Sequence, residues 1–600
     1  MTRRDDDLRV KLGRIGNRGR LGRNKAFFAE VRGGAKKQGY SAARLASAKP
    51  RPRGPSTRGR GRGAGAAVRL ATGMTSVHMA KQSPHFALLN STRRVVVKAH
   101  IVRHQGRKSP PLTAHIAYLK RDGVDKGGER AHLFGSEADL SDGRDFAERC
   151  QDDRHHFRFI VSPDDATEMS DLKAFTRELL TDMEYDLGTK LDWVAVEHHN
   201  TDNPHIHVLV RGKADDGKDL VIDRDYISNG IRARAQHRAT LELGPRPEHE
   251  IRSALEREVG ADRWTALDAA LRRAADASGL ADMRPNPSRP TDRHIRGLMI
   301  GRLQRLEAMG LTTKVGPSQW SIAKDAQATL RELGTRNDII KTMHKALAEH
   351  GIDRLHGDYA IHKSAPPPVV GRLIAKGLHD DLTGETYAIV DGVDGRPHHI
   401  RFRDTEPLEH APPAGGIVEV RRSDIEGRRT PTIAARSDLT IEAQITAPGA
   451  TWLDRQLVSR ERAEVSHLGF GREVREALQR RIDHLVSEGL ARRDGQRVIF
   501  ARQLIDTLRQ RNLDAAAADI AIKSGLPYRP VRSGESVAGL YRERLNLASG
   551  RFAMIDDGLG FTLVPWKPSL ERHLGEHVSG RVEPETVDWS FGRKRSLGIS

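Results

Sequence analysis

The clearest pattern of apolar and polar positions lies in residues 193–211, Trp-Val-Ala-Val-Glu-His-His-Asn-Thr-Asp-Asn-Pro-His-Ile-His-Val-Leu-Val-Arg. Apolar residues alternate on both sides of the polar segment Asn-Thr-Asp-Asn-Pro, which predicts two short strands joined by a turn. Side chains on a strand project to alternate faces, so His205 and His207 point to the same side. A hairpin would bring His198 or His199 beside them. The pattern predicts that three imidazoles meet at one point.

Such a cluster would form a site for a divalent ion. Neutral imidazole binds several divalent ions, and three protein ligands leave positions open for water or substrate, as in catalytic metal sites. The alternative is that His-x-His occurs by chance in a chain with 27 histidines. The third histidine on the preceding strand and the polar turn favour the metal site.

The same kind of pattern extends to a domain around this hairpin. The predicted elements are, in order, a strand over residues 94–103, a helix begun by Ser109 and Pro110, a strand over 156–162, a helix from the cap Ser170 to the stop Gly188, the histidine hairpin and a helix over 225–237. These predictions rest on β-branched runs, capping residues and helical spacing of apolar residues. The order predicts an α+β domain with a central, largely antiparallel sheet that ends near residue 250.

Two later segments share one pattern. Residues 302–311 precede the stretch 314–322, and residues 481–490 precede 493–500 in the same way. Each predicts an amphipathic helix ended by glycine and then a turn between two short strands. This profile is typical of a winged helix-turn-helix, a fold often used on duplex DNA, but two ordinary helix-hairpin units would give the same pattern.

Two further regions are rich in β-type alternation. Residues 386–402 and 416–421 alternate around glycine-containing turns, which predicts a small β-barrel. A second β-rich run at 551–564 follows an expected helix at 542–545.

These patterns divide the chain into six segments. The first is rich in Arg, Gly, Lys, Ala and Ser and cannot bury enough apolar surface to fold, so we expect a disordered basic arm. The expected segments are 1–92 basic arm, 93–250 α+β domain, 251–365 helical and winged-helix-like region, 366–440 small β-rich domain, 441–530 second winged-helix-like region, and 531–600 β-containing region with a basic tail.

Composition indicates the kind of binding partner and the cellular compartment that we expect. The 600 residues contain 100 Lys+Arg against 80 Asp+Glu, a formal charge of +20, so a polyanion such as nucleic acid is the expected partner. Aromatic residues make up only 5%, which favours phosphate contacts over base stacking. The single cysteine, Cys150, excludes an internal disulfide and a four-cysteine zinc module, and fits a reducing cytoplasm. There is neither an apolar run of about twenty residues nor a secretory signal, so no membrane insertion is expected.

The histidine block resembles a known motif. His198-His-Asn-Thr-Asp-Asn-Pro-His-Ile-His207 resembles the third motif of the HUH-endonuclease relaxases of conjugative and mobilisable elements, most closely the P-type group that includes the VirD-type border endonucleases. In that motif the first histidine stands nine positions before the last, which selects His198 over His199. Residues 114–123, Ala-His-Ile-Ala-Tyr-Leu-Lys-Arg-Asp-Gly, resemble the first motif, which assigns Tyr118 as nucleophile. The resemblance spans residues 94–250, and the later region resembles a long C-terminal domain of undefined activity.

The resemblance implies an HUH-type antiparallel sheet with flanking helices and a metal-dependent, tyrosine-mediated nick in origin-of-transfer DNA. It implies a covalent 5′-phosphotyrosine, a free 3′-hydroxyl and religation by reversal. The implied metal is Mg²⁺ or Mn²⁺, although imidazole alone suits zinc or copper as well. The implied partners are single-stranded and duplex DNA, accessory mobilisation proteins and a type IV coupling protein that carries the protein, made in the cytoplasm, into a recipient cell.

Several residues remain candidates for parts of this reaction. Asp202, inside the histidine block, and Glu197 are candidate general bases, and each has a structural role as the alternative. For Tyr118 the alternative is a half-exposed tyrosine on a helix surface. The candidate DNA-binding residues are Lys120, Arg121, Arg211, Arg232 and Arg234, with plain surface charge as the alternative.

Three other functions are compatible with parts of the sequence. A rolling-circle replication initiator would keep the chemistry and differ in its origin. A mononuclear metal oxygenase could use His198, His205 and His207 with a carboxylate, but it explains neither the charge nor Tyr118. A non-enzymatic regulator built on winged helices would leave the histidines as scaffold. The long arm before Tyr118 is unusual for the relaxase assignment, so either it is an addition or the assigned start is too early.

Overall fold

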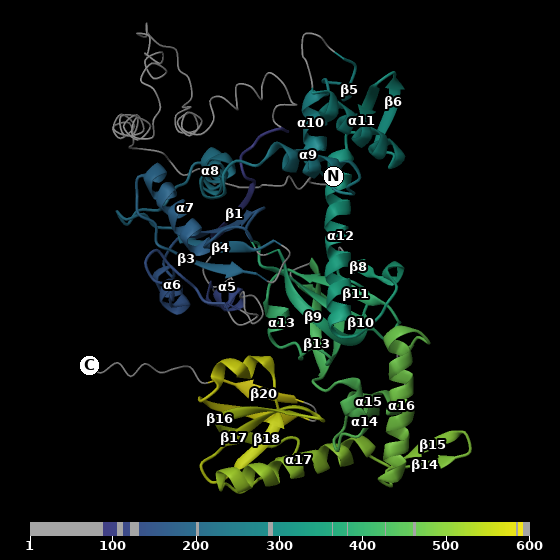
Figure 1. Cartoon of the computed structure of the whole chain (residues 1–600). Helices are drawn as coiled ribbons and strands as arrows, with labels where there is room; N and C mark the ends of the chain where they lie inside the picture. Colours follow the sequence, from purple (N-terminus) through teal and green to yellow (C-terminus); the bar gives the residue numbers. More distant parts are fainter. Residues whose placement is uncertain are drawn as a thin grey trace. The chain divides into compact units, whose positions relative to one another are not determined.

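The computed structural model describes residues 88–104, 112–120, 131–199, 203–285, 292–362, 364–380, 382–425, 428–459, 464–583 and 586–591. The chain forms two compact units, one reaching Thr335 and including Asp381–Thr383, the other comprising Arg336–Asp380 and the chain from Gly384 onward (Figure 1). In the described part of the chain, every helix is too short or too polar to cross a membrane.

The first unit begins with a domain around a four-stranded antiparallel sheet, in the order β1-β2-β4-β3. Its elements are β1 Val95–Arg103, α5 Leu112–Leu119, α6 Gly143–Arg149, β2 His155–Pro163, α7 Leu172–Leu187, β3 Trp193–His198, β4 His205–Arg211, the π-helical turn η2 Tyr226–Gly230 and α8 Ile231–Leu243. The α+β domain with an antiparallel central sheet that the sequence predicts is present.

The two faces of this sheet differ in chemistry. Phe157 and Phe159 of β2 and Val208 of β4 lie in a buried core with Phe175 and Leu179 of α7. Figure 1 shows α7 and α8 on this side of the sheet and α5 on the other. Because successive strand residues point to opposite faces, the apolar alternation creates a hydrophobic core on one side and frees the other for polar side chains.

Helix boundaries differ in detail from the prediction. The N-cap of α7 is Asp171, whose carboxylate accepts hydrogen bonds from the amides of Lys173 and Ala174 at 2.8 and 3.2 Å. Ser170, the predicted cap, instead donates its hydroxyl to Glu242. Serine and aspartate are both good caps, so sequence alone does not choose between neighbours. The predicted stop at Gly188 is correct, with φ of 67° in the left-handed region.

The rest of the first unit and the middle of the second contain the predicted helix-hairpin pairs. In the first unit the elements are α9 Glu248–Val259, α10 Ala266–Ala274, β5 Leu280–Asp282, α11 Arg293–Ala308, β6 Thr312–Gly316, β7 Gln319–Ile322 and α12 Ala326–Glu349, which continues into the second unit. In the second unit they are α14 Ile441–Ile445, α15 Trp452–Val458, α16 Gly469–Ser487, β14 Ala491–Asp494, β15 Arg497–Phe500 and α17 Leu504–Ser524. In both places a helix leads into a two-stranded hairpin and then a long helix.

The second unit also contains two sheets, with strand orders β13-β12-β9-β10-β11-β8 and β20-β19-β16-β17-β18. Their elements are η3 His356–Asp358, β8 Ala360–His362, β9 Val369–Asp380, β10 Glu385–Gly392, β11 Pro397–Phe402, α13 Glu406–Glu409, β12 Ile417–Ile425, β13 Arg428–Ser437, β16 Ser536–Leu547, β17 Gly550–Asp556, β18 Phe561–Pro565, η4 Pro568–His573, β19 His577–Glu583 and β20 Thr586–Ser590.

Two predictions for this region are wrong. Over the described residues no ladder joins the outermost strands of either sheet, so no closed barrel is found, although the edge strands β18 and β20 lie close together. Alternation and turns predict strand pairs, but closure depends on pairing between distant strands, which the pattern does not encode. The helix expected at 542–545 lies inside strand β16, where Glu543, Arg544 and Leu545 pair with β17. There, tertiary pairing overrides the helix propensity of Arg-Glu-Arg-Leu.

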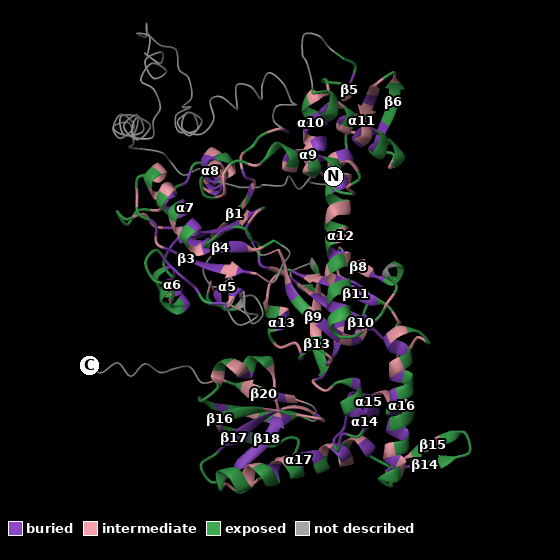
Figure 2. Cartoon of the chain, viewed as in Figure 1, coloured by how far each residue is buried: buried purple, intermediate pink, exposed green. Residues whose placement is uncertain are grey.

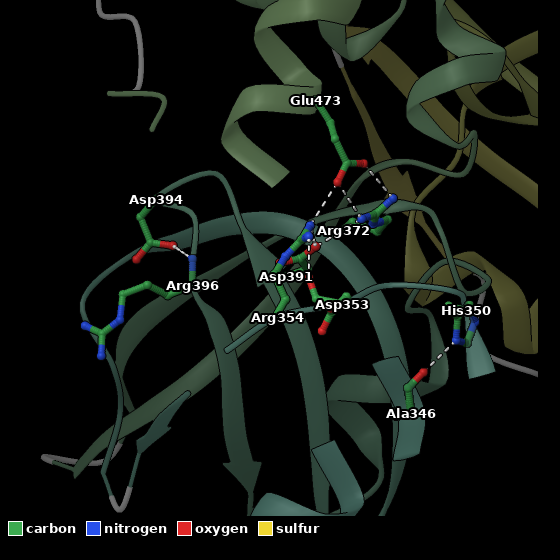
Figure 3. Close-up of polar contacts among 9 residues, drawn as sticks. All are labelled: Ala346, His350, Asp353, Arg354, Arg372, Asp391, Asp394, Arg396 and Glu473. Carbon is green, nitrogen blue, oxygen red and sulfur yellow. Dashed lines mark hydrogen bonds and ion pairs between the residues drawn. The ribbon is translucent and has the colours of Figure 1, made fainter. Parts of the chain in front are cut away.

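A buried ion cluster joins α16 to the six-stranded sheet (Figure 3). The fully buried carboxylate of Asp391 accepts from Nη2 of Arg354 at 2.8 Å and from Nη2 of Arg372 at 3.0 Å. Glu473 of α16 pairs with the same two arginines at 2.9 and 3.1 Å. The Arg372 guanidinium also lies 4.6 Å from the ring centre of Phe470. Two carboxylates thus balance two guanidinium groups, and the pairing fixes α16 on the sheet.

Candidate metal centre

Strands β3 and β4, largely buried in Figure 2, place three histidines together. His198 lies directly opposite His205 in the antiparallel register, and His207 follows two residues later on the same face. The ring centres of His198 and His207 are 4.3 Å apart, and one ring nitrogen from each histidine lies within 4.8 Å of the others. No other group of three potential ligand residues is found among the described residues. The three imidazoles could hold a metal ion, and His199 is not part of the group.

Backbone carbonyls orient two of the rings. Nε2 of His198 lies 2.8 Å from the carbonyl oxygen of Leu119, and Nδ1 of His205 lies 3.0 Å from that of Asn203. A carbonyl only accepts hydrogen bonds, so each of these nitrogens carries a proton. The lone pair of a neutral ring then lies on Nδ1 of His198 and on Nε2 of His205. Such outer contacts are a regular feature of histidine metal sites.

The helix that carries Tyr118 ends at this cluster. Tyr118 is the penultimate residue of α5, and Leu119, whose carbonyl meets His198, is the last. Leu119 is fully buried, which holds this helix end against the sheet. The side chain of Tyr118 lies outside the described part of the structure, as do Arg121 and Asp202. Lys120 follows the helix and is half-buried.

The face that carries the metal cluster also carries a buried arginine. Ile160 lies opposite His207, and Arg158 lies two residues away on the same face of β2. The Arg158 side chain donates from Nε to Nε2 of His156 at 3.1 Å, and its Nη1 lies 3.4 Å from Nδ1 of His115. Nη1 is also 3.4 Å from the carbonyl oxygen of Leu382. None of these partners is anionic.

The charge of Arg158 is therefore retained in the site. Burial lowers the pKa of Arg158 to about 10, which still leaves it cationic at neutral pH. Burial, then the charge of Arg158, lowers the pKa of His115 well below its usual range and that of His156 to about 2. Both rings are neutral at pH 7 and accept hydrogen bonds without neutralising the guanidinium. A buried cation without a carboxylate partner is costly, and an anionic ligand would offset that cost.

Sequence reasoning did not identify Arg158, His156 or His115 as site residues. The signal for two of them is present in His156-Phe-Arg-Phe-Ile160, where polar His156 and Arg158 alternate with Phe157 and Phe159. Alternation with period two puts them on the face opposite the apolar core.

Other candidate residues lie elsewhere. Glu197 alternates with His198 on β3 and projects to the opposite face of the sheet, away from the cluster. Arg211 forms a paired contact with Asp153 at 2.8 and 3.2 Å. Arg234 pairs with Asp186, its Nε at 2.8 Å from the carboxylate. These two guanidinium groups are used within the fold, whereas Arg232 is exposed on α8.

Comparison with known families gives two matches. Residues 135–235, which contain the three clustered histidines and Arg158, match the relaxase family described as MobA/VirD2-like, nuclease domain. Residues 299–435 and 424–598 match a family described as protein of unknown function, DUF3363. Searches against curated proteins and against solved structures gave no match.

Proposed function

The chain belongs to the DUF3363 family and carries a MobA/VirD2-like relaxase nuclease domain, and from this premise we propose that it nicks one DNA strand at an origin of transfer. The observation that carries the proposal is the buried cluster of His198, His205 and His207 inside the matched nuclease domain. A relaxase nuclease domain implies a DNA substrate and endonuclease activity. The origin, the strand and the accessory and coupling proteins belong to the proposal.

In the proposed reaction the Tyr118 hydroxyl attacks the phosphorus of one phosphodiester. The new bond joins the tyrosine oxygen to phosphorus, and the bond from phosphorus to the 3′ oxygen breaks. The leaving oxygen takes up a proton and becomes a free 3′-hydroxyl, while the 5′ end stays attached to the protein. The position of Tyr118 next to Leu119, which contacts His198, supports this assignment. A phenol with an ordinary pKa near 10 must lose its proton during attack.

The histidine cluster fits a cation in this reaction. His198, His205 and His207 would hold a divalent ion, which supplies charge stabilisation to the phosphate as a Lewis acid. Mg²⁺ or Mn²⁺ is the proposed ion. An all-imidazole donor set also suits zinc or copper, so the metal requirement is part of the test.

Arg158 supports the same proposal from the neighbouring strand. We assign it to the DNA phosphate, because its charge is buried on the metal face and its described contacts are neutral. Guanidinium presents several donors in a plane that matches phosphate oxygens. Neutral His156 and His115 hold the group in place.

The test uses the full chain with Mn²⁺ and labelled single-stranded oligonucleotides that tile the DNA neighbouring its gene. A denaturing gel should show a labelled protein adduct with wild type and none with Tyr118→Phe. Tyr226→Phe is a matched control: its hydroxyl donates to Asp186 at 2.8 Å, and burial raises its pKa, so the adduct should persist. Adduct formation by Tyr118→Phe would refute the assigned nucleophile. The absence of any wild-type adduct across all oligonucleotides and metals would refute the nuclease.

A further inference from the structure

The chain contains one structural unit twice, with the first copy beginning before the DUF3363 match and the second lying inside it. Helices α9 to α12 with the hairpin β6/β7 correspond, in order, to helices α14 to α17 with the hairpin β14/β15. The first hairpin lies in the first compact unit of the chain and the second in the other, and their internal contacts can be compared one by one.

The strongest correspondence is a buried arginine in each copy. Arg302 of α11 contacts Asp268 through Nε at 2.8 Å and Nη2 at 2.9 Å, and Arg481 of α16 contacts Asp454 through the same atoms at 2.8 and 2.8 Å. All four side chains are buried to 1% exposure or less. The remaining donors of each arginine reach three backbone carbonyls, those of Val259, Ala261 and Arg263 in the first copy and of Ile445, Ala447 and Gly449 in the second.

The sequence separations agree on the aspartate side of the network, whereas Arg302 follows Asp268 by 34 residues and Arg481 follows Asp454 by 27. Asp268 and Asp454 each close a capping box with the threonine three positions earlier. The amide before each aspartate donates to a side chain of the preceding helix, Leu267 to Glu258 at 3.1 Å and Leu453 to Gln444 at 3.3 Å. The three carbonyls bound by each arginine follow Glu258 and Gln444 at identical intervals. An entire buried network is therefore repeated, which chance similarity of two helices does not explain.

The sheets that follow repeat too. β9 to β13 and β16 to β20 have the same order, fifth-fourth-first-second-third, and in the first sheet β8 pairs beyond the third strand as an added edge. Gly371 and Gly539 occupy equivalent places: a Cβ on either would stand 2.3 Å from a carbonyl oxygen, that of Asp391 or Asp556. The duplicated unit is thus a helix-hairpin-helix segment plus a five-stranded sheet.

Surface charge can be compared once the copies are aligned. The amide of Ala323 donates to Leu311 at 3.0 Å and that of Ala501 to Leu490 at 2.9 Å, which fixes the register around both hairpins. In this register five exposed or half-buried cations recur: Arg293 with Arg472, Arg296 with Arg475, Lys314 with Arg493, Lys324 with Arg502, and Arg331 with Arg509. Other exposed cations do not recur: aligned on the buried aspartates, Arg257, Arg272 and Arg273 correspond to Ala443, Val458 and Ser459.

The recurrence of cations at equivalent surface positions needs a cause other than folding. The buried arginines and aspartates must be kept to fold each copy, whereas most surface substitutions change stability by less than about 0.5 kcal/mol. The recurring cations lie in the first two turns of α11 or α16, on the hairpin, and just before or within the first two turns of the next helix. A partner that meets all of these positions must present negative charge over an extended length, which the backbone of duplex DNA does.

We propose that each copy of the repeated unit binds the phosphate backbone of duplex DNA through these recurring cations. This function is separate from the proposed nicking, in which a single strand enters the histidine face of the nuclease domain. It gives the repeated unit a role in holding the duplex that flanks the cleaved strand.

The test compares variants with equal loss of charge in the full chain. The first-copy variant is Arg293→Gln/Arg296→Gln/Lys314→Gln, the second-copy variant is Arg472→Gln/Arg475→Gln/Arg493→Gln, and the control is Arg257→Gln/Arg272→Gln/Arg273→Gln. The loss of charge is matched because residues 1–87 contain 21 Lys+Arg against 4 Asp+Glu, an excess of positive charge that attracts polyanions independently of the repeats. Affinity for a labelled duplex is measured by fluorescence anisotropy over a range of salt concentrations.

Each repeat variant should weaken duplex binding and reduce the slope of log Kd against log salt by about 0.9 for every lost phosphate contact. The control should keep the wild-type slope, and adduct formation on a short single strand should be unchanged in all variants. Variants in which the same arginines are replaced by lysine, with Lys314 unchanged, should keep most of the affinity. Equal slopes in the repeat and control variants would overturn the proposal. So would full duplex affinity in a variant that combines the first-copy and second-copy substitutions and melts like wild type. That second result would indicate an acidic protein as the partner instead.

Discussion

The carbonyl oxygen of Leu119 lies 2.8 Å from Nε2 of His198. This contact joins the end of the helix that carries Tyr118 to one of the three clustered histidines. It also sets the ring tautomer, because a carbonyl can only accept the proton on Nε2. The proposed nucleophile and the proposed metal ligands are thus positioned by one backbone group.

Loss of a ring from the cluster should weaken metal binding. We expect His207→Ala to lower the affinity for Mn²⁺ or Co²⁺ by more than the roughly 10–100-fold that follows loss of an outer-shell partner. Isothermal titration calorimetry measures this directly, without DNA. His199→Ala is the matched control, since His199 lies outside the cluster and should leave binding unchanged. Equal losses in the two variants would contradict the three-histidine site.

Replacement of Arg158 should reduce nicking activity without reducing the stability of the fold. We expect Arg158→Gln to reduce the rate of adduct formation by about 10²–10³-fold, as for loss of one donor to a developing charge. The melting temperature should not fall, because the variant removes a buried cation that has no carboxylate partner among the described residues. Arg144→Gln, an exposed change on α6, is the control. A strongly reduced melting temperature with unchanged activity would assign Arg158 to the fold.

The repeated buried ion pair should be a major determinant of stability. Asp454→Asn leaves the guanidinium of Arg481 buried without its partner, which costs about 3–5 kcal/mol. Asp483→Asn removes an exposed partner of Arg493 and should cost about 0–1 kcal/mol. Thermal melting followed by circular dichroism should show a large downward shift for the first variant only. Similar shifts for both would mean that the network around Arg481 adapts to the loss.

Buried His156 should make the nuclease domain sensitive to acid. Its pKa falls from 6.5 to about 2, first through burial and then through the charge of Arg158. Below pH 6.5 His156 is protonated in the unfolded chain but stays neutral in the folded state. The contribution of His156 to the free energy of unfolding is therefore fully present above this pH and declines as pH falls. His156→Gln should therefore show a smaller drop in melting temperature between pH 7 and 5 than wild type. Exposed His249→Gln should behave as wild type, and a parallel decline in all three proteins would exclude His156 as the cause.

The sequence predicted the histidine cluster because the necessary information was local. Two strands joined by a short turn put His205 and His207 on one face with His198 or His199 beside them, and the resemblance to the family motif selected His198. Arg158 required knowledge of which strand pairs with β4, and strand order is decided by contacts between distant parts of the chain. The same limit explains why no closing ladder is found among the described residues where a small β-barrel was expected. At 542–545 a helix-forming segment became a strand because β17 pairs with it.

Two copies of one unit in a single chain also change how binding strength arises. Once the first copy is bound, attachment of the second becomes intramolecular, and its effective concentration is set by the connection between the copies. Such avidity can exceed either single affinity by about 10²–10⁴-fold when the geometry permits both contacts. A moderate affinity in each copy would then give slow release of the whole protein, while either copy alone could detach and rebind quickly. The duplication would let a single polypeptide keep one copy bound to DNA while the other copy detaches and rebinds, without a second subunit.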